Sequence, residues 1–257
     1  MRVSIVTPSY NQAPFIERTL RSVLDQDHPD VEYIVMDGGS TDGTVAILER
    51  YAARLVWESR KDRGQSDAIN KGLRAATGEI VAYLNADDVY EPRALTRVVE
   101  FFRAHPEAQW VYGRCRIVDE ADREIRRAIT VYKNLASRTY SYAKLLTENF
   151  IPQPATFWRR TLLAEVGDFE EDENWCMDYD YWLRIGRRHA PGVIREYLAR
   201  FRYHPGTKSG SAFVRQLDDQ QRLARRHGAA HPLALLAGRA NYYRTVWTYR
   251  LLARLGR

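Results

Sequence analysis

The sequence predicts an α/β protein in which a mostly parallel sheet is flanked by helices and followed by a C-terminal helical extension. The first observation is that short apolar segments, typical of buried strands, alternate with amphipathic segments of helical period over the first half of the chain. The second is the length of 257 residues, which suits one large domain or a domain with an appendage. The third is the stretch 233–257, which has no acidic residue and carries apolar residues at helical spacing.

The elements of the first half follow one another regularly. Strands are expected at 3–8, 31–37, 54–58, 79–84 and 108–118, and helices at 12–26, from Thr44 onward, at 65–78 and at 92–106. The second strand ends in the stretch DGGSTDGT, whose glycines give the backbone freedom to turn. One of Ser40, Thr41 and Asp42 is expected to cap the helix after this turn. Pro92 suits the start of the last of these helices.

The pattern loosens from about residue 119. Residues 119–150 have weak periodicity and are expected to be connecting and lid material. The stretch 178–188 predicts a helix, and 195–204 predicts another strand. No internal repeat or low-complexity segment interrupts the chain.

Composition narrows the class of protein without choosing a function. The net charge of +6 favours anionic partners such as nucleotides, phospholipid surfaces or nucleic acid. Cys115 and Cys176 are the only cysteines and form no CxxC pair, so neither a disulfide framework nor a zinc site is indicated. The sequence has no signal-peptide pattern and no apolar run of about 20 residues. A cytoplasmic enzyme is therefore expected.

Acidic side chains stand where two predicted strands end, and in sheets of this kind ligands bind at the carboxyl ends of the strands. Asp37 follows the second strand, and the stretch NADD places Asp87 and Asp88 after the fourth. Such carboxylates suit Mg²⁺ or Mn²⁺ bound together with phosphate oxygens. Equally, NADD could form a solvated turn in which Asp88 caps the next helix. In MDYDYWLR, a carboxylate could act as a general base or merely favour the first turn of a helix.

The basic tail leaves three alternatives open. One helical stripe and one basic face can be drawn for it: Leu236, Ala240, Tyr243, Trp247, Leu251 and Leu255 on the stripe, and Arg250, Arg254 and Arg257 on the other face. Such a helix can lie on an anionic membrane surface, pack on the rest of the domain or contact another subunit.

Six motifs occur in an order that resembles glycosyltransferase family 2, whose members are inverting sugar transferases of the Rossmann-like GT-A fold. They are VSIVTPSYN, VMDGGSTDGT, DRGQSDAINKGLRAATGEIVAYLNADDVYEP, PQPATFWRR, MDYDYWLR and RYHPGTKS. The resemblance extends over about residues 1–210. It implies a nucleotide-sugar-binding half at 1–118, an acceptor and catalytic half at 119–210, and a separate basic amphipathic extension at 211–257.

The resemblance implies nucleotide-binding roles residue by residue. Thr7, Pro8 and Tyr10, at the end of the first strand, would receive the nucleotide, and Asp37 would bind its base. Arg63 and Asp67 would lie on a segment that closes over the nucleoside. Asn85 and Lys208 complete the set, with Lys208 in a late loop over the diphosphate. Asn85 departs from the family pattern, which often has Asp at that position.

The resemblance also implies a metal site and a catalytic base. Asp87 is expected to ligate Mn²⁺ or Mg²⁺, with Asp88 and His204 assisting. Asp178 aligns with the base of the family, whereas Asp180 is the competing candidate. Met177 stands where the family has a first acidic residue.

The function expected from this resemblance is inverting transfer of a sugar from a nucleotide-diphosphate sugar, preferably a UDP-sugar, to an acceptor hydroxyl. The acceptor would be a saccharide or a lipid-linked molecule in cell-surface polysaccharide or glycolipid assembly, reached in the cytoplasm or at the inner face of the cell membrane. A nucleic-acid partner is not expected, and a homodimer stays open. The alternatives are an inactive nucleotide-sugar-binding or scaffold protein and a sugar nucleotidyltransferase, although TPSYNQAPF lacks the Gly-rich basic loop that the latter needs.

Overall fold

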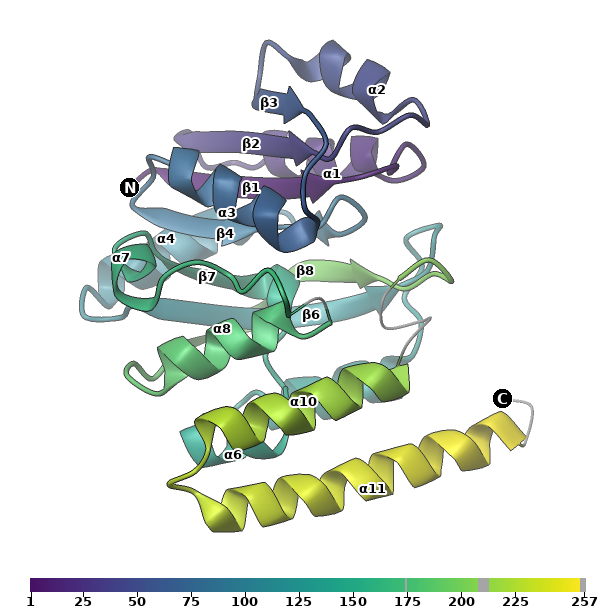
Figure 1. Cartoon of the computed structure of the whole chain (residues 1–257). Helices are drawn as coiled ribbons and strands as arrows, with labels where there is room; N and C mark the ends of the chain where they lie inside the picture. The colour runs from purple at the N-terminus through teal and green to yellow at the C-terminus, as the bar shows by residue number, and fades with distance from the viewer. Residues whose placement is uncertain (174, 208–212, 255–257) are drawn as a thin grey trace.

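The computed structural model of the protein describes residues 1–173, 175–207 and 213–254. Within them, eight strands form one sheet in the order β3-β2-β1-β4-β7-β6-β8-β5 (Figure 1). The strands are β1 (Val3–Ser9), β2 (Val31–Asp37), β3 (Val56–Ser59), β4 (Ile80–Tyr83), β5 (Val89–Tyr90), β6 (Trp110–Val118), β7 (Thr156–Arg159) and β8 (Gly192–Arg202).

The first four strands in this order are parallel to one another, as the sequence predicts. The short strand β7 runs antiparallel to both β4 and β6, and β8 then returns parallel to β6. Every residue of β1 and of β4 is buried, because helices cover both faces of the sheet there. The predicted α/β class with a mostly parallel sheet is confirmed.

The helices pack on the sheet and on one another. They are α1 (Ile16–Leu24), α2 (Thr44–Tyr51), α3 (Gln65–Ala75), α4 (Ala94–Ala104), α5 (Arg127–Ala136), α6 (Tyr142–Thr147), the 3₁₀ turn η1 (Gln153–Ala155), α7 (Leu162–Val166), α8 (Met177–Gly186), α10 (Phe213–His227) and α11 (Pro232–Arg254). Figure 1 shows α3 on the near face of the sheet, with α1 and α4 on the far face. Gly72 allows α3 to approach β1, because a Cβ atom there would lie 2.4 Å from Val6.

The structure adds detail where the sequence pattern is weak. The stretch 119–150 contains α5 and α6 rather than connecting chain alone. In α5 the only buried residue is Thr130, so its sequence lacks a clear apolar stripe. The N-cap of α2 is Gly43 rather than one of the three expected residues, although the Thr44 N–H donates to the carboxylate of Asp42 at 3.0 Å.

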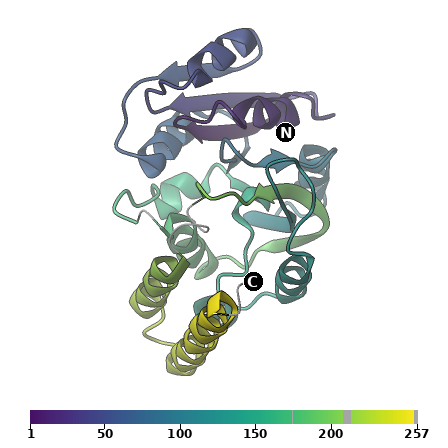
Figure 2. The ribbon, with the colours of Figure 1, turned by 90° about the vertical axis from the view of Figure 1, so that its right-hand side faces the viewer.

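The C-terminal region forms two helices that pack on the rest of the protein. In α10, Leu223 is fully buried and Arg222 forms an ion pair with Glu173 at 2.5 Å. Helix α11 lies against α6 and α10 at the foot of the molecule (Figures 1 and 2). In the described parts of the chain, no helix combines the length and apolar character required to cross a bilayer.

Candidate active site

The candidate site lies where β1, β2 and β4 end at one edge of the sheet (Figure 1). Ser9, the last residue of β1, pairs with Asp37, the last residue of β2. Tyr83 ends β4, and the NADD turn follows after one residue, Leu84. The topology therefore brings together acidic segments that lie some 50 residues apart in the chain.

At the end of β1, the three side chains predicted to receive a nucleotide differ in exposure. Thr7 is fully buried, and its hydroxyl lies 3.0 Å from that of Tyr33. Pro8 is buried as well, whereas the Tyr10 side chain is 62% exposed. Among these three, Tyr10 alone has a side chain that a ligand can reach without rearrangement.

Asp37 organises the Gly-rich turn that follows it. Its carboxylate accepts hydrogen bonds from the N–H groups of Gly39 and Ser40 at 3.1 and 2.8 Å. It also accepts bonds from the hydroxyls of Ser40 and Ser59, at 2.5 and 2.7 Å. A nucleotide base would have to share these carboxylate oxygens, and the base-binding role of Asp37 stays a prediction.

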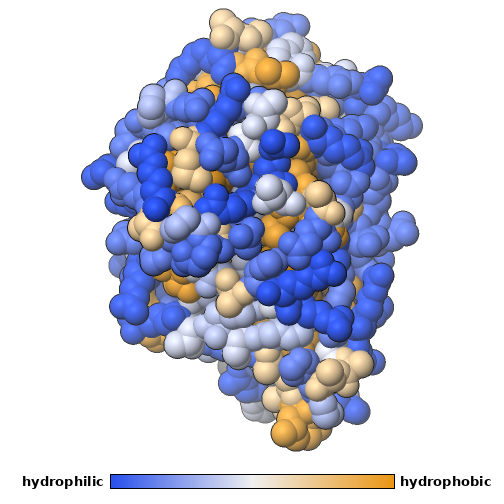
Figure 3. Space-filling view, turned by 90° about the vertical axis from the view of Figure 1, so that its left-hand side faces the viewer, coloured by the Kyte–Doolittle hydropathy of each residue, from blue (hydrophilic) through white to orange (hydrophobic). Residues whose placement is uncertain are grey.

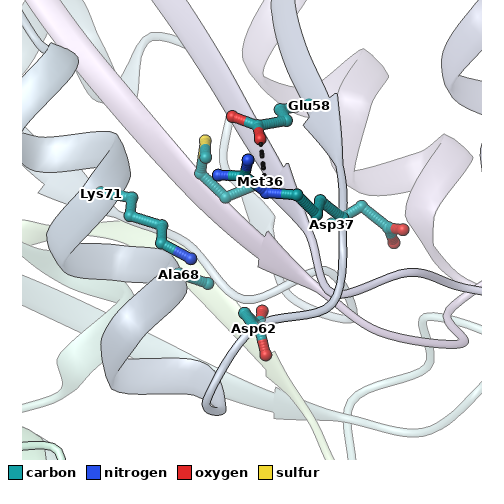
Figure 4. A pocket seen from close by; sticks show the side chains of 7 residues that line it. Met36, Asp37, Glu58, Asp62, Ala68 and Lys71 are labelled. Carbon is teal, nitrogen blue, oxygen red and sulfur yellow. Dashed lines mark ion pairs between the residues drawn. The ribbon is translucent and has the colours of Figure 1, made fainter.

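Basic and acidic side chains line an open groove of about 480 Å³ beside this turn. Its lining is Arg60, Lys61, Asp62, Arg63, Asp67 and Lys71. A narrow slot next to it is lined in part by Arg60 and Glu58, which form an ion pair at 3.2 Å. Figure 4 shows Lys71 reaching over this slot from α3, while the Asp37 carboxylate points away from it.

Within the groove, Asp67 is a buried anion held by cations. Its side chain is 2% exposed and pairs with Lys71 at 2.8 Å and with Arg63 at 3.0 Å. Burial alone raises the pKa of Asp67, but the hydrogen bonds from Lys71 and Arg63 outweigh it and lower this pKa to about 2. Arg63 also bonds to Glu171 at 2.7 Å. Its side chain therefore links Asp67 of α3 to the segment that precedes α8.

The NADD turn holds its two carboxylates in different surroundings. Asp87 is 18% exposed, and its Oδ2 lies 3.1 Å from Nε2 of His204. Asp88 is fully buried, and its carboxylate accepts bonds from the Arg202 N–H at 2.9 Å and from Asn85 at 3.3 Å. Burial and then the neighbouring Asp87 charge raise the pKa of Asp88 well above its usual range.

A divalent cation fits the donor atoms of Asp87 and His204. These two atoms are hydrogen-bonded to each other at 3.1 Å, and a bound ion would take the place of this bond. Within the described residues, no group of three or more His, Cys, Asp or Glu side chains could hold a metal by itself. Mg²⁺-type sites are commonly completed by substrate phosphates and water, so two protein donors are sufficient.

Arg202 bonds to the NADD turn from inside the protein. This residue was not identified from the sequence. This side chain is fully buried, and its Nε donates to the carbonyl oxygen of Asp87 at 2.8 Å. Its other nitrogens bond to the Asp119 carbonyl and to the Asp122 carboxylate. In the sequence, Arg202 is one of several charged residues in the predicted strand 195–204, and nothing in that pattern indicates that its side chain is buried.

A chain of side-chain amides supports the same turn, and it was also missed. Asn85 accepts a bond from Gln65 at 2.6 Å and donates to Gln153 at 3.2 Å. Gln153 in turn donates to the carbonyl oxygen of Tyr83 at 2.8 Å. Gln153 belongs to the PQPATFWRR motif, whose position in the chain gave no indication of this contact.

The two acids of α8 point to different surroundings. Asp178 is partly exposed, and its charge contributes, after burial, to raising the pKa of Tyr83 at the end of β4. Asp180 is 1% exposed and accepts bonds from Arg184 and His227, both at 2.8 Å. Although burial raises the pKa of Asp180, the bond from His227 and the charge of Arg184 lower it overall. Lys208, the remaining predicted site residue, lies outside the described residues.

Solved structures with a similar fold are glycosyltransferases. TarS of S. aureus in complex with UDP-GlcNAc matches 87% of this chain and 66% of its own, with a TM-score of 0.66 and 19% identity. The mannosyltransferase PcManGT of Pyrobaculum calidifontis, solved with GDP-Man and Mn²⁺, matches 98% of this chain and 80% of its own, with a TM-score of 0.67 and 22% identity. The protein therefore has the GT-A fold of glycosyltransferases.

The family follows from the sequence comparisons. The profile described as glycosyl transferase family 2 matches residues 4–167. An uncharacterised glycosyltransferase of Nostoc is 35% identical over 65% of this chain, which spans about half (53%) of that relative. A PGL/p-HBAD biosynthesis glycosyltransferase of Mycobacterium tuberculosis is 30% identical over 76% of this chain and 73% of its own length. The chain belongs to glycosyl transferase family 2, which confirms the resemblance predicted from the motifs.

Proposed function

We propose that this protein transfers a sugar from a nucleotide-diphosphate donor to an acceptor hydroxyl, with inversion at the sugar carbon. The observation that carries the proposal is the convergence of the basic groove, the Asp87–His204 pair and Asp178 at one edge of the sheet. The bound UDP-GlcNAc of TarS and GDP-Man of PcManGT support a nucleotide-sugar donor. A UDP-sugar is the preferred donor, and the groove carries the cations that its phosphates require.

The donor end of the reaction needs charge stabilisation at the leaving diphosphate. Asp87 and His204 would hold Mn²⁺ or Mg²⁺, with Asp88 supporting the turn from inside. When bound, this ion supplies positive charge to the diphosphate oxygens. Lys71 and Arg63 remain beside the groove, where they orient the nucleotide and attract its negative charge.

At the acceptor end, a base must take the hydroxyl proton. Asp178 accepts this proton while the acceptor oxygen forms a bond to the anomeric carbon. The bond from that carbon to the diphosphate oxygen breaks, and its electron pair leaves with the nucleotide diphosphate. Because one displacement occurs on the face opposite the leaving group, the configuration inverts. Asp180 keeps α8 in position through Arg184 and His227.

The acceptor that we propose is a saccharide or a lipid-linked molecule in polysaccharide or glycolipid assembly, reached from the cytoplasm or at the inner face of the cell membrane. The name of the mycobacterial relative, a PGL/p-HBAD biosynthesis glycosyltransferase, supports this class of acceptor.

An inactive nucleotide-sugar-binding protein is the second candidate, and one observation favours it. Met177, at the position where a first acid is expected, is buried, and its sulfur accepts a bond from Ser66 at 2.9 Å. Asp178 is thus the only carboxylate that this dipeptide can offer. A binding protein would retain the groove and lose the chemistry.

A donor screen followed by a turnover assay separates these candidates. In the screen, the melting temperature of the full chain is measured with UDP- and GDP-sugars, with and without Mn²⁺, because a ligand that binds only the native state raises this temperature. The transferase proposal expects a Mn²⁺-dependent rise and slow release of nucleotide diphosphate from the same donor. A rise without any release, even with acceptor sugars, would favour the binding protein. No rise with any donor contradicts both.

A further inference from the structure

The inner face of α11 is committed to packing on its neighbours. Ala234 and Val246 are buried, and a Cβ atom on Gly238 would lie 3.1 Å from the carbonyl oxygen of Leu146 in α6. The hydroxyl of Tyr242 donates to Asp218 of α10 at 2.6 Å. These contacts fix the rotation of the helix about its own axis and so decide which residues face outward.

The outward face carries an apolar stripe. The outer stripe consists of Leu233, Leu236, Ala240, Tyr243 and Trp247, which repeat at three- and four-residue spacing along one side of the helix. The four large side chains are between 57% and 82% exposed. Figure 3 shows apolar side chains, in orange, at the lower tip of the molecule where α11 begins. At 1.5 Å per residue, the stripe is about 20 Å long.

Arginines border the stripe on both sides. Arg239 and Arg244 are exposed, and the Arg239 guanidinium lies 5.8 Å from the ring centroid of Tyr243. At 100° per residue, these two arginines lie on opposite flanks of the stripe. The sequence from residue 220 to residue 257 contains eight arginines and no acidic residue.

We propose that the outer stripe binds the surface of an anionic membrane, with the helix lying in the plane of the lipid headgroups. Apolar side chains would enter the boundary of the acyl chains, while the flanking arginines contact lipid phosphates. A second copy of this chain is a poorer occupant, because two such faces would bring arginines against arginines. An apolar surface of another protein would leave the arginines without counter-charges.

The orientation of α11 relates this surface to the candidate site. In Figure 1, α11 runs from left to right as β1 and β2 do, so its C-terminal end lies on the side where these strands end. The strands β1 and β2 lie at the end of the molecule away from α11 (Figure 1), so a chain docked along α11 would hold its site above the bilayer surface. The docking itself does not depend on sugar transfer and can be measured without a donor.

Vesicle co-sedimentation of the full chain tests the proposal. We expect binding to vesicles of equimolar phosphatidylglycerol and phosphatidylcholine, weaker binding at high salt, and no binding to pure phosphatidylcholine. The double variant Leu236→Ser, Trp247→Ser should bind at least about tenfold more weakly, because each side chain loses its apolar burial. The double variant Arg239→Gln, Arg244→Gln should bind about thirtyfold more weakly at low salt.

Matched variants at the opposite end of the molecule serve as controls. Val56 on β3 is 65% exposed, and Arg103 on α4 is also exposed, so Val56→Ser and Arg103→Gln should leave vesicle binding unchanged. Wild-type melting temperature in each variant shows that it is folded. Wild-type vesicle binding in the folded Leu236→Ser, Trp247→Ser variant would overturn the proposal. So would a dimer in sedimentation velocity that this variant converts to a monomer, because the stripe would then be a subunit interface.

Discussion

The NADD turn and the start of α8 each carry two acids, and in each pair one carboxylate is buried and the other is accessible. Asp88 and Asp180 are at most 1% exposed, whereas Asp87 and Asp178 are partly exposed. The buried acids differ in their partners. Asp180 is bonded by Arg184 and His227, but Asp88 is bonded by a backbone N–H and an amide beside the Asp87 charge.

The two pairs of acids show two ways in which the fold accommodates a buried carboxylate next to a partly exposed one. The bonds that Asp180 accepts from His227 and Arg184 lower its pKa, so it keeps its charge and anchors α8. A buried acid beside another acid has a raised pKa, and the pair favours a nearby cation. The surroundings of Asp180 therefore suit a residue that positions a catalytic base, and those of Asp88 suit a residue beside a metal site.

The largest effect is expected at the accessible acid of the NADD turn. Asp87→Ala should abolish transfer and remove the metal-dependent part of nucleotide-diphosphate affinity, because the exposed carboxylate is lost. Isothermal titration with UDP, with and without Mn²⁺, measures this. Asp88→Ala serves as the comparison and should affect metal-dependent affinity less. Equal nucleotide binding with and without Mn²⁺ in both wild type and Asp87→Ala would remove the metal assignment.

A second test addresses the accessible acid of α8. Asp178→Asn should lower turnover by ~10²–10⁴-fold, the range typical of a lost general base, while donor and metal affinity stay nearly unchanged. Steady-state kinetics with saturating donor and a binding assay on the same variant check both parts. If Asp178→Asn keeps its turnover and folded Asp180→Asn loses it, the two acids must exchange roles.

The buried acid of α8 should matter for stability more than for turnover. Asp180→Asn leaves Arg184 and His227 without their shared anion, and we expect the free energy of unfolding to fall by about 2 kcal/mol, less than for a pair shielded fully from water. Urea unfolding followed by fluorescence measures it. Arg103→Gln, on the surface of α4, should change stability by less than about 0.5 kcal/mol.

The smallest effect is expected in the pH dependence conferred by Asp67. Its pKa of about 2 lies below the ordinary value of 3.8, so its ion pairs stabilise the fold above about pH 4. This contribution should be lost as the pH falls from 4 toward 2. Since Arg63 is 70% exposed, we expect only about 1–2 kcal/mol. Asp67→Asn should flatten this part of the acid-unfolding curve, and a curve parallel to that of wild type would contradict the assignment.

The elements that the sequence predicts best are those whose burial is continuous. The all-buried strands β1 and β4 appear as apolar runs, and both were predicted with their ends within about two residues. By contrast, β5 and β7 have two and four residues and depend on pairing with β8, β4 and β6, so no local pattern reveals them.

Residues of the site follow the same rule. Acids at strand ends are visible in the sequence because their position relative to an apolar run is local. Arg202 is not, because its contact with the NADD turn joins residues 115 positions apart. Its partner carbonyl on Asp87 could not be identified without the fold. The outward rotation of α11 was also beyond the sequence, since a stripe of apolar residues predicts equally well a buried face.

The contact between Asp180 and His227 has a consequence for exchanging parts between relatives. The family profile ends at residue 167, before α8 and α10 begin. Yet His227 in the last turn of α10 bonds to the same helix that presents Asp178, and Arg222 bonds to Glu173 just before it. In a chimaera, a foreign C-terminal region joined after α8 would leave Asp180 and Glu173 without these partners. A chimaera must therefore take α8 and α10 from the same parent.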